Sequence, residues 1–285
     1  MVKQLIVYGL IYGGIISLGA IGLTLIFRIL RFGHFAHGDM MTLGAYLALF
    51  FKATAGWPMW AAALASLVIT PMAAVLIDRL LYKPLRRTTP AILLIASVGM
   101  ALFLRHLVQF IWGAQVQVYN PGIERPLLIW GVRIRPSQIW IIVMAVVLVF
   151  LVWVFLQKTK FGKAMRAMAD NMDLAAVSGI DTERMITWTW VLGAVLAAAA
   201  GIMLGIDTQL RPVMGWIMLL PLFAATILGG VGNPYGAIAG GMIIGMSQEL
   251  STMYINTAYK PAVAFVLMVL LLLLRPQGLF GAKGA

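Results

Sequence analysis

The chain has 285 residues, of which 62% are apolar and only 11% are charged, with a mean hydropathy of +0.97. This composition excludes an ordinary soluble domain, and the absence of cysteine excludes disulfides, thiolate catalysis and cysteine metal sites. A net charge of +12 would suggest nucleic acid in a soluble protein, but here the cations cluster in loops beside apolar runs, where membrane topology and anionic headgroups explain them.

Several apolar runs are long enough to cross a bilayer as helices, which takes about 20 residues. The runs are continuous rather than alternating, so they predict helices and not a barrel. We therefore expect an all-α, polytopic transmembrane bundle of eight or nine membrane segments, forming one domain over residues 1–285. The expected segments are 5–27, 34–51, 59–77, 91–112, 139–156, 185–206, 216–228, one fed by the glycine-rich run 229–241, and 262–274.

Small residues recur every four positions in two of these segments. Gly9, Gly13 and Ser17 form one such ridge, and a second contains Gly193, Ala197, Gly201 and Gly205. Ridges of this kind predict neighbouring helices at close approach.

The segment 34–51 begins with polar residues and is only marginally long enough to span. It either crosses the membrane or is a broken or re-entrant element lining a cavity. Polar groups beside such a segment are candidates for a pathway or gate, namely His34, Phe35, His37 and Asp39. The alternative is a helix entry at the headgroups, with Asp39 near a helix N-terminus. Arg105, in the segment 91–112, is expected to snorkel to the outer interface.

The longest polar stretch is 157–184, and we expect it to contain a helix from Gly162 to Val177. Thr159 is expected to cap its start, and Gly179 suits a left-handed position after its end. Helical spacing predicts a methionine-rich face of Met165, Met168 and Met172, and a charged face of Lys163, Arg166, Asp170 and Asp173. Such a helix is suited to docking in a partner's groove, because methionine adapts to irregular surfaces. The alternative is a solvated loop lying on the headgroups.

The run 229–241 contains Gly229, Gly230, Gly232 and Asn233. We favour close helix packing and a tight turn at Asn233–Pro234, because small-residue contacts are common between spans. The alternative is an unwound hinge whose backbone groups line the pathway.

Cation counts predict the orientation of the bundle. If all nine segments span, one side of the membrane holds 13 Lys and Arg residues and the other side holds 7. The side with 13 contains the loops 28–37, 78–89 and 157–185 and the tail. If 34–51 only dips into the membrane, the bias is still 12 to 8. Either count places residues 157–184 in the cytoplasm.

Motifs for independent chemistry are absent from the sequence. It has no phosphate-binding G-x-x-x-x-G-K-[ST] loop, no H-E-x-x-H and no G-x-S-x-G. Its three histidines form no metal-site pattern, and its nine acidic residues lie mostly in loops or at segment ends, which disfavours an ion relay. The sequence therefore predicts a non-enzymatic transport subunit that another component drives.

Four stretches, in matching order, resemble the smaller permease type of bacterial ABC importers for branched-chain amino acids. They are HFAHGD at 34–39 with LGAY at 43–46, GKAMRA at 162–167 continuing through DLA at 173–175 to GI at 179–180, LGGVGNPYG at 228–236, and RPQGLFG at 275–281. The chain departs from the family at His34, usually Asn, and at Asp173-Leu174, where the coupling signature has Glu-Ala.

The resemblance implies a multi-pass subunit of the bacterial inner (cytoplasmic) membrane, with residues 157–184 as its cytoplasmic coupling segment. The implied partners are two cytoplasmic ATPase subunits, a second homologous permease and a periplasmic binding protein. ATP is then bound by the partners, and no cofactor or metal is expected in this chain. The implied cargo is branched-chain or other hydrophobic amino acids; the alternatives are a permease for urea or short amides, and an ATP-independent channel or secondary carrier.

Overall fold

A computed structural model describes residues 2–120, 122, 124–129 and 131–281. Its principal helices are α1 (Val2–Leu30), α2 (Ala36–Thr54), α3 (Met59–Ile77), α5 (Pro90–Trp112), α6 (Pro136–Lys158), α7 (Lys160–Asp170), α8 (Met172–Val177), α9 (Thr182–Asp207), α10 (Met214–Gly229), α11 (Pro234–Ser251) and α12 (Lys260–Leu274). The π-helix η1 (Asp78–Tyr82) and the short α4 (Lys83–Leu85) extend α3, and a 3-10 turn η2 (Thr257–Tyr259) precedes α12. The expected all-α bundle is therefore confirmed in its main architecture.

Six helical stretches in the described part of the chain are long and apolar enough to cross a membrane. They are Val2–Leu30, Met59–Leu85, Pro90–Trp112, Pro136–Lys158, Thr182–Asp207 and Thr257–Leu274. The helices α2, α10 and α11 account for the other three expected segments. Because α10 has only 16 residues, it is about 24 Å long and shorter than a bilayer core.

Helix α1 forms the centre of the bundle, with its most extensive contacts to α11 and α9. The ridge of small residues on α1 lies against α11: a Cβ on Gly9 would stand 2.6 Å from the Met246 sulfur, and one on Gly13 would stand 3.1 Å from the Met242 Cα. Ser17 donates a hydrogen bond of 3.0 Å to the Ile238 carbonyl. The predicted close approach is confirmed for this ridge.

The second ridge lies on α9 and packs against α1 and α2. A Cβ on Gly193 would stand 2.8 Å from Ile26 Cδ1 of α1, and one on Gly201 would collide with the backbone of Met41 in α2. Two central helices, α1 and α9, are thus buried along most of their length, whereas α3, α5, α6 and α12 expose apolar faces. The core forms where backbones approach closely, and the outer helices present side chains to the surroundings.

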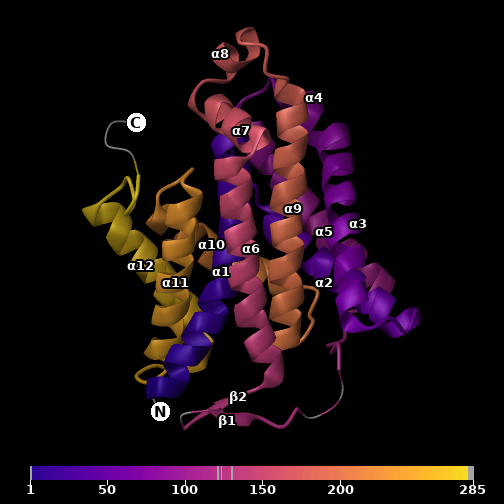
Figure 1. Ribbon diagram of the computed structural model, residues 1–285, viewed down its shortest axis with the longest axis vertical. Helices are drawn as coiled ribbons and strands as arrows, with labels where there is room; N and C mark the ends of the chain where they lie inside the picture. The colour runs from indigo at the N-terminus through magenta and orange to yellow at the C-terminus, as the bar shows by residue number, and fades with distance from the viewer. Residues whose placement is uncertain (1, 121, 123, 130, 282–285) are drawn as a thin grey trace.

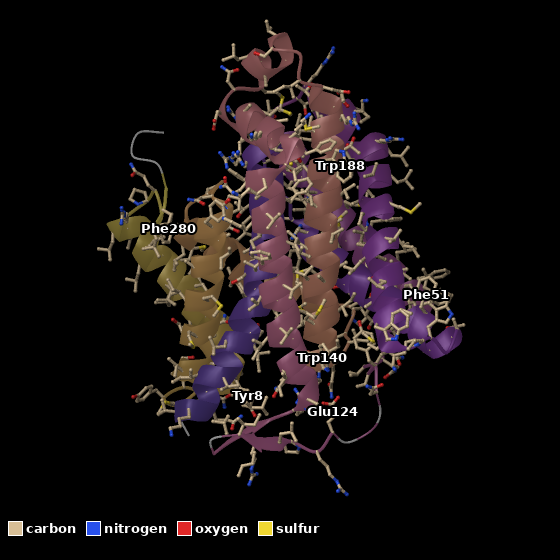
Figure 2. All side chains as sticks on the ribbon, viewed as in Figure 1. Tyr8, Phe51, Glu124, Trp140, Trp188 and Phe280 are labelled. Carbon is tan, nitrogen blue, oxygen red and sulfur yellow. The ribbon has the colours of Figure 1, made fainter. Side chains whose placement is uncertain are left out.

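The two ends of the bundle differ (Figure 1). Helices α7 and α8 project at one end, whereas the N-terminus and the strands β1 and β2 lie at the other. Figure 2 shows Trp188 towards the α7 end and Trp140 towards the strand end. Tryptophans at both ends of the long apolar helices match the aromatic residues found at the two interfaces of a membrane.

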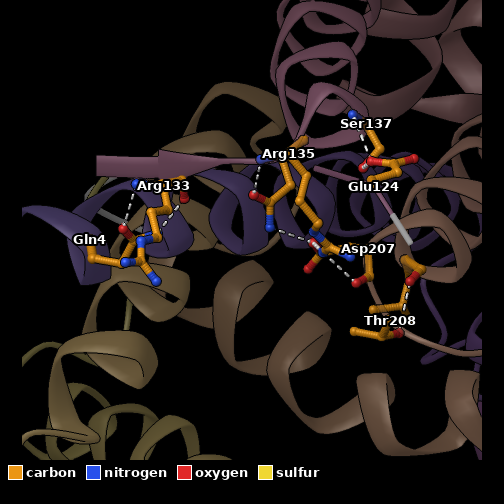
Figure 3. A network of polar contacts seen from close by, with 9 residues as sticks. Gln4, Glu124, Arg133, Arg135, Ser137, Asp207 and Thr208 are labelled. Carbon is orange, nitrogen blue, oxygen red and sulfur yellow. Dashed lines mark hydrogen bonds and ion pairs between the residues drawn. The ribbon is translucent and has the colours of Figure 1, made fainter. Parts of the chain in front are cut away.

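A β-hairpin, which the sequence analysis did not predict, follows α5. Strands β1 (Leu127–Ile129) and β2 (Val132–Ile134) pair antiparallel, and Gly131 adopts a φ of +79° in the turn. Gln4 holds the hairpin to α1, because its amide donates to the Arg133 carbonyl at 2.7 Å and accepts from the Arg133 N–H at 2.9 Å (Figure 3). Arg135 donates to Asp207 at 2.7 Å and ties the end of the hairpin to α9. These two short strands are a local addition to a bundle that is otherwise helical, as predicted.

Candidate transport and coupling sites

The connection between α1 and α2 turns inside the bundle and buries His34, and the first turn of α2 buries His37. His34 and His37 are each 0% exposed. His37 Nε2 lies 2.9 Å from the Gly19 carbonyl of α1, and the ring of His34 packs edge-on against Trp190 of α9 with 4.9 Å between centroids. Phe35 is half-buried against Phe223 of α10. These residues hold the start of α2 in place, and their assignment to a pathway remains a prediction.

Asp39, in the first turn of α2, forms an ion pair with Arg105 of α5. Arg105 Nε lies 3.2 Å from Oδ1 and Nη2 lies 3.2 Å from Oδ2, a bidentate arrangement. The Arg105 guanidinium also lies 4.5 Å from the ring centre of Trp216, near the start of α10. The expectation that Arg105 snorkels outward is wrong, because a buried carboxylate lies within its reach.

Sequence analysis named Asp39 but missed Arg105 and Trp216 as its neighbours. Arg105 lies seven residues before the end of α5 at Trp112, about 10 Å along the axis. A charge at that depth needs a partner. The sequence could therefore have indicated that Arg105, the only Lys or Arg inside an expected span, needs an acidic partner, although it does not identify that partner.

The first turns of α2 and α10 touch through their backbones. A Cβ on Gly38 would collide with the carbonyl of Gly215, and a Cβ on Gly215 would collide with the carbonyl of Gly38. The N–H of Gly215 donates to Thr42 Oγ1 of α2 at 3.0 Å. Two helix N-termini therefore meet within the bundle beside the ion pair of Asp39.

The glycine-rich run forms a tight turn between α10 and α11 and continues as regular helix. Gly230 and Gly232 have φ values of +101° and +85°, which favour glycine. Asn233 caps α11 by accepting from the N–H groups of Tyr235 and Gly236, and a Cβ on Gly229 would collide with the backbone of Gly236. The structure shows the favoured packing and turn, and a role of these residues as a hinge or in the pathway remains a prediction.

The C-terminal stretch docks on this turn. The Leu279 N–H donates to the Leu228 carbonyl at 2.8 Å, and the Asn233 amide donates to the Phe280 carbonyl at 3.1 Å. The predicted residues of the glycine-rich run thus lie at the α10–α11 turn, on which the tail docks. His34 and Phe35 lie in the α1–α2 connection, and His37 and Asp39 lie in the first turn of α2. The two predicted sets of pathway residues lie on different elements.

The polar stretch 157–184 contains two helices where one was predicted. The Thr159 hydroxyl accepts from the Gly162 N–H at 3.0 Å, and Gly179 has a φ of +84°, so both predicted ends are confirmed. The chain leaves the helical conformation at Asn171, whose φ is −153°. Its side chain accepts from the Leu174 N–H at 2.9 Å and starts α8. Because asparagine is a strong N-cap, it separates Met172 from the helix of Met165 and Met168.

The methionine face of α7 packs on the chain itself. Met165 and Met168 are 2% and 1% exposed. The Arg166 guanidinium bonds to the Leu156 carbonyl at the end of α6, and a Cβ on Gly162 would collide with that same carbonyl. The expectation that Met165 and Met168 enter a partner's groove is therefore corrected, because these side chains attach α7 to the bundle.

Other groups of this stretch face outward. Lys163, Asp170 and Asp173 are exposed, and Asp170 makes a solvent-exposed ion pair of 3.4 Å with Arg28 of α1. Leu174 is 64% exposed and Val177 is 88% exposed. Met172 is half-buried and lines, with Asp170 and Asp173, a cavity of about 440 Å³ beside the end of α1. The most exposed apolar groups of this stretch thus lie on α8.

Comparison with known proteins shows the family of the chain. Residues 5–272 match the model of the branched-chain amino acid transport system permease components. The chain is a member of this permease family. It is 32% identical to the high-affinity branched-chain amino acid transport system permease protein LivH of Escherichia coli K12, over 96% of this chain and 93% of that protein. It is also 32% identical to BraD of Pseudomonas aeruginosa, over 98% of this chain and 95% of that protein.

A solved structure shares the fold. PsaBC from Streptococcus pneumoniae in complex with Fab matches with a TM-score of 0.57 and 13% identity, over 98% of this chain and 93% of that one. Family membership and the six long apolar helices identify a multi-pass membrane permease. As a permease component it is a transport subunit and not an enzyme.

Proposed function

We propose that the chain translocates branched-chain amino acids across the bacterial inner membrane as one permease subunit of an ATP-driven importer. The observation that carries this is the similarity to LivH and BraD over nearly the whole chain. The partners are two cytoplasmic ATPase subunits, a second homologous permease and a periplasmic binding protein. The chain itself needs no cofactor, because the ATPase subunits bind the ATP.

The whole chain then acts as a single permease domain with nine membrane segments. Six of these segments are the long apolar helices, and the other three are α2, α10 and α11. The seventh crossing consists of α10 together with the residues that precede it. This topology places α7 and α8 at the cytoplasmic end, where the loop cations are most numerous, and the hairpin at the periplasmic end. Figure 1 supports it, since these elements lie at opposite ends of the bundle.

The topology predicts different labelling of two introduced cysteines, because the natural chain has none. Val177→Cys is expected to resist a membrane-impermeant maleimide in intact spheroplasts and to react after permeabilisation. Leu128→Cys, in the hairpin and 72% exposed, is expected to react in both conditions. Labelling of Val177→Cys from outside would place the coupling segment in the periplasm and exclude the proposed function.

Residues 157–184 couple ATP hydrolysis by the partner subunits to movement of the permease. The side chains of this segment that pack on the bundle and those that face outward have distinct roles. Met165, Met168 and Arg166 fix α7 on the bundle, so a movement of α7 moves α6 and α9 with it. Lys163, Asp170, Asp173 and the exposed side chains of α8 contact the ATPase subunit, and Met172 and Gly179 determine the course of the chain around α8. Closure of the ATPase pair is thereby transmitted to the bundle as a rigid-body movement.

Reconstitution tests the cargo and the driving force together. Proteoliposomes with the permease pair, the ATPase subunits and the binding protein are expected to accumulate radiolabelled leucine only when ATP is supplied. Excess unlabelled valine is expected to compete, whereas urea and acetamide are not. Flux without the ATPase subunits would favour a channel or carrier, and competition by urea or acetamide alone would favour an amide permease.

A further inference from the structure

The ion pair of Asp39 and Arg105 lies at the edge of the chain, not at its centre. Asp39 is 1% exposed, but the Arg105 side chain is 12% exposed and Trp216 beside it is 40% exposed. Leu102, which lies one turn before Arg105 on the same side of α5, is 44% exposed. The guanidinium therefore lies between the buried carboxylate and the partly exposed ring of Trp216.

Polar groups continue along this outer face of α5. His106 is exposed next to Arg105, and its Nδ1 lies 3.0 Å from Oε1 of Gln109. An arginine and a histidine on the outside of a membrane-spanning helix would be costly against lipid tails, and such residues usually face a bundle interior or an aqueous cavity. This face of α5 and the start of α10 are therefore better suited to a protein partner or an aqueous space than to lipid.

The chemistry of this edge matches the two charges of an amino acid. A bidentate arginine recognises a carboxylate by its fork of N–H groups, and a carboxylate pairs with an ammonium group. The first turns of α2 and α10 meet beside the pair, and their N–H dipoles favour a negative charge there. Trp216 and Leu102 offer exposed apolar surface for an aliphatic side chain.

We propose that Asp39, Arg105 and Trp216 form a transient binding site for the transported amino acid inside the membrane. Arg105 exchanges the Asp39 carboxylate for the α-carboxylate of the substrate, and Asp39 then pairs with the α-ammonium group. Trp216 packs on the side chain. The site rests on the proposed function, because it needs an α-amino acid as cargo.

A purely structural ion pair predicts a different response to mutation. Removing one partner of a buried pair leaves an uncompensated charge, whereas replacing both partners is often neutral for stability. The double variant Asp39→Asn/Arg105→Gln leaves a polar amide at both positions and removes both charges. A structural role predicts that this variant transports normally, whereas a substrate site predicts that it does not.

The test uses the complete transporter in proteoliposomes with photo-leucine, a diazirine analogue of leucine, as cargo. Illumination during ATP-driven uptake is expected to label the peptides that contain residues 102–110 and 214–217. The double variant is expected to assemble with its partners and to keep ATP hydrolysis stimulated by the binding protein within about twofold. Its uptake and its labelling of these peptides are expected to fall by about tenfold or more, the loss expected for a charge-assisted contact.

A control neutralises a second arginine–carboxylate pair, which is more exposed and is joined through one carboxylate oxygen. Arg135 and Asp207 are 2.7 Å apart at the hairpin end, and Arg135→Gln/Asp207→Asn is expected to keep labelling of the α5 and α10 peptides at the level of the unmodified protein. Normal uptake by the Asp39 and Arg105 double variant, or labelling confined to other peptides, would overturn the site. Absence of any ATP-driven photo-leucine uptake by the unmodified transporter would instead count against the proposed function.

Discussion

Replacing Leu174 with aspartate is expected to release the ATPase subunits from the permease while leaving the permease itself folded. Leu174 is 64% exposed on α8, the helix that projects furthest from the bundle in Figure 1. Its N–H is bonded to the capping Asn171, so it occupies an early helical position where aspartate is favourable. The substitution therefore preserves α8 and changes only its outer surface.

The expected effect is large because a charge replaces an apolar contact. Loss of an anchoring side chain at the centre of an interface costs about 2 kcal/mol or more, which corresponds to roughly thirtyfold weaker binding. Recovery of ATPase subunits with the purified permease should drop accordingly, and ATP-driven leucine uptake with it. Both are measured on the same preparation, by quantitative gel analysis and by uptake in proteoliposomes.

The chain offers a matched control at its other end. Leu128→Asp makes the same change at a residue of similar exposure, 72%, in the hairpin. It is expected to leave ATPase recovery unchanged, since the hairpin lies at the end opposite to α8. Full ATPase recovery with Leu174→Asp would show that α8 is not the docking element and would leave the polar face of α7 as the alternative.

Membrane segments could be predicted from the sequence because hydrocarbon imposes a strong constraint on length and polarity. The bounds expected for the third segment, 59–77, are those of α3, and the ends of the other long helices differ from the expected ends by no more than three residues. The small-residue ridges were equally informative, because a spacing of four places Gly9, Gly13 and Ser17 on one helical face against α11. Both signals are local and do not depend on which elements become neighbours.

The orientation of a helical face could not be predicted in the same way. Periodicity placed Met165 and Met168 on one side of a helix but could not say whether that side met a partner or the chain itself. The structure buries both residues, and the exposed apolar groups are on α8. The break between α7 and α8 was nevertheless predictable, because Asn171 is followed by a short apolar run that an asparagine can cap.

Contacts between residues far apart in the sequence also could not be predicted. Asp39 and Arg105 are 66 positions apart, and nothing in either segment indicates that α2 and α5 are neighbours. The hairpin was missed for a related reason, since strands of three residues carry too little alternation to be distinguished from a loop. Trp216 was placed in a membrane segment, but its position over Arg105 follows only from the short α10 and its contact with α2.

That contact between α10 and α2 provides the second prediction. Gly38→Ala is expected to destabilise the folded permease, because the added methyl group would collide with the carbonyl of Gly215 and stand 2.8 Å from its carbonyl carbon. The neighbouring atoms are backbone and cannot rotate away. One of the two helices, α2 or α10, must therefore move. This movement would strain the hydrogen bond from the Gly215 N–H to Thr42 and shift Asp39 relative to Arg105. Overpacking of this kind costs about 1–3 kcal/mol, and a backbone contact belongs at the upper end of that range.

Gly99→Ala is the matched control within α5, because a Cβ on Gly99 meets nothing within 4 Å. Alanine at an unobstructed helical position stabilises by up to about 1 kcal/mol relative to glycine. The thermal unfolding midpoints of the two purified variants, measured in one detergent, should therefore differ. The midpoint of Gly38→Ala is expected to lie about 5 °C or more below that of the unmodified protein, and the midpoint of Gly99→Ala at or above it. Equal stability of the two variants would mean that α2 and α10 separate without cost, and their N-termini could then not form a fixed part of the site around Asp39.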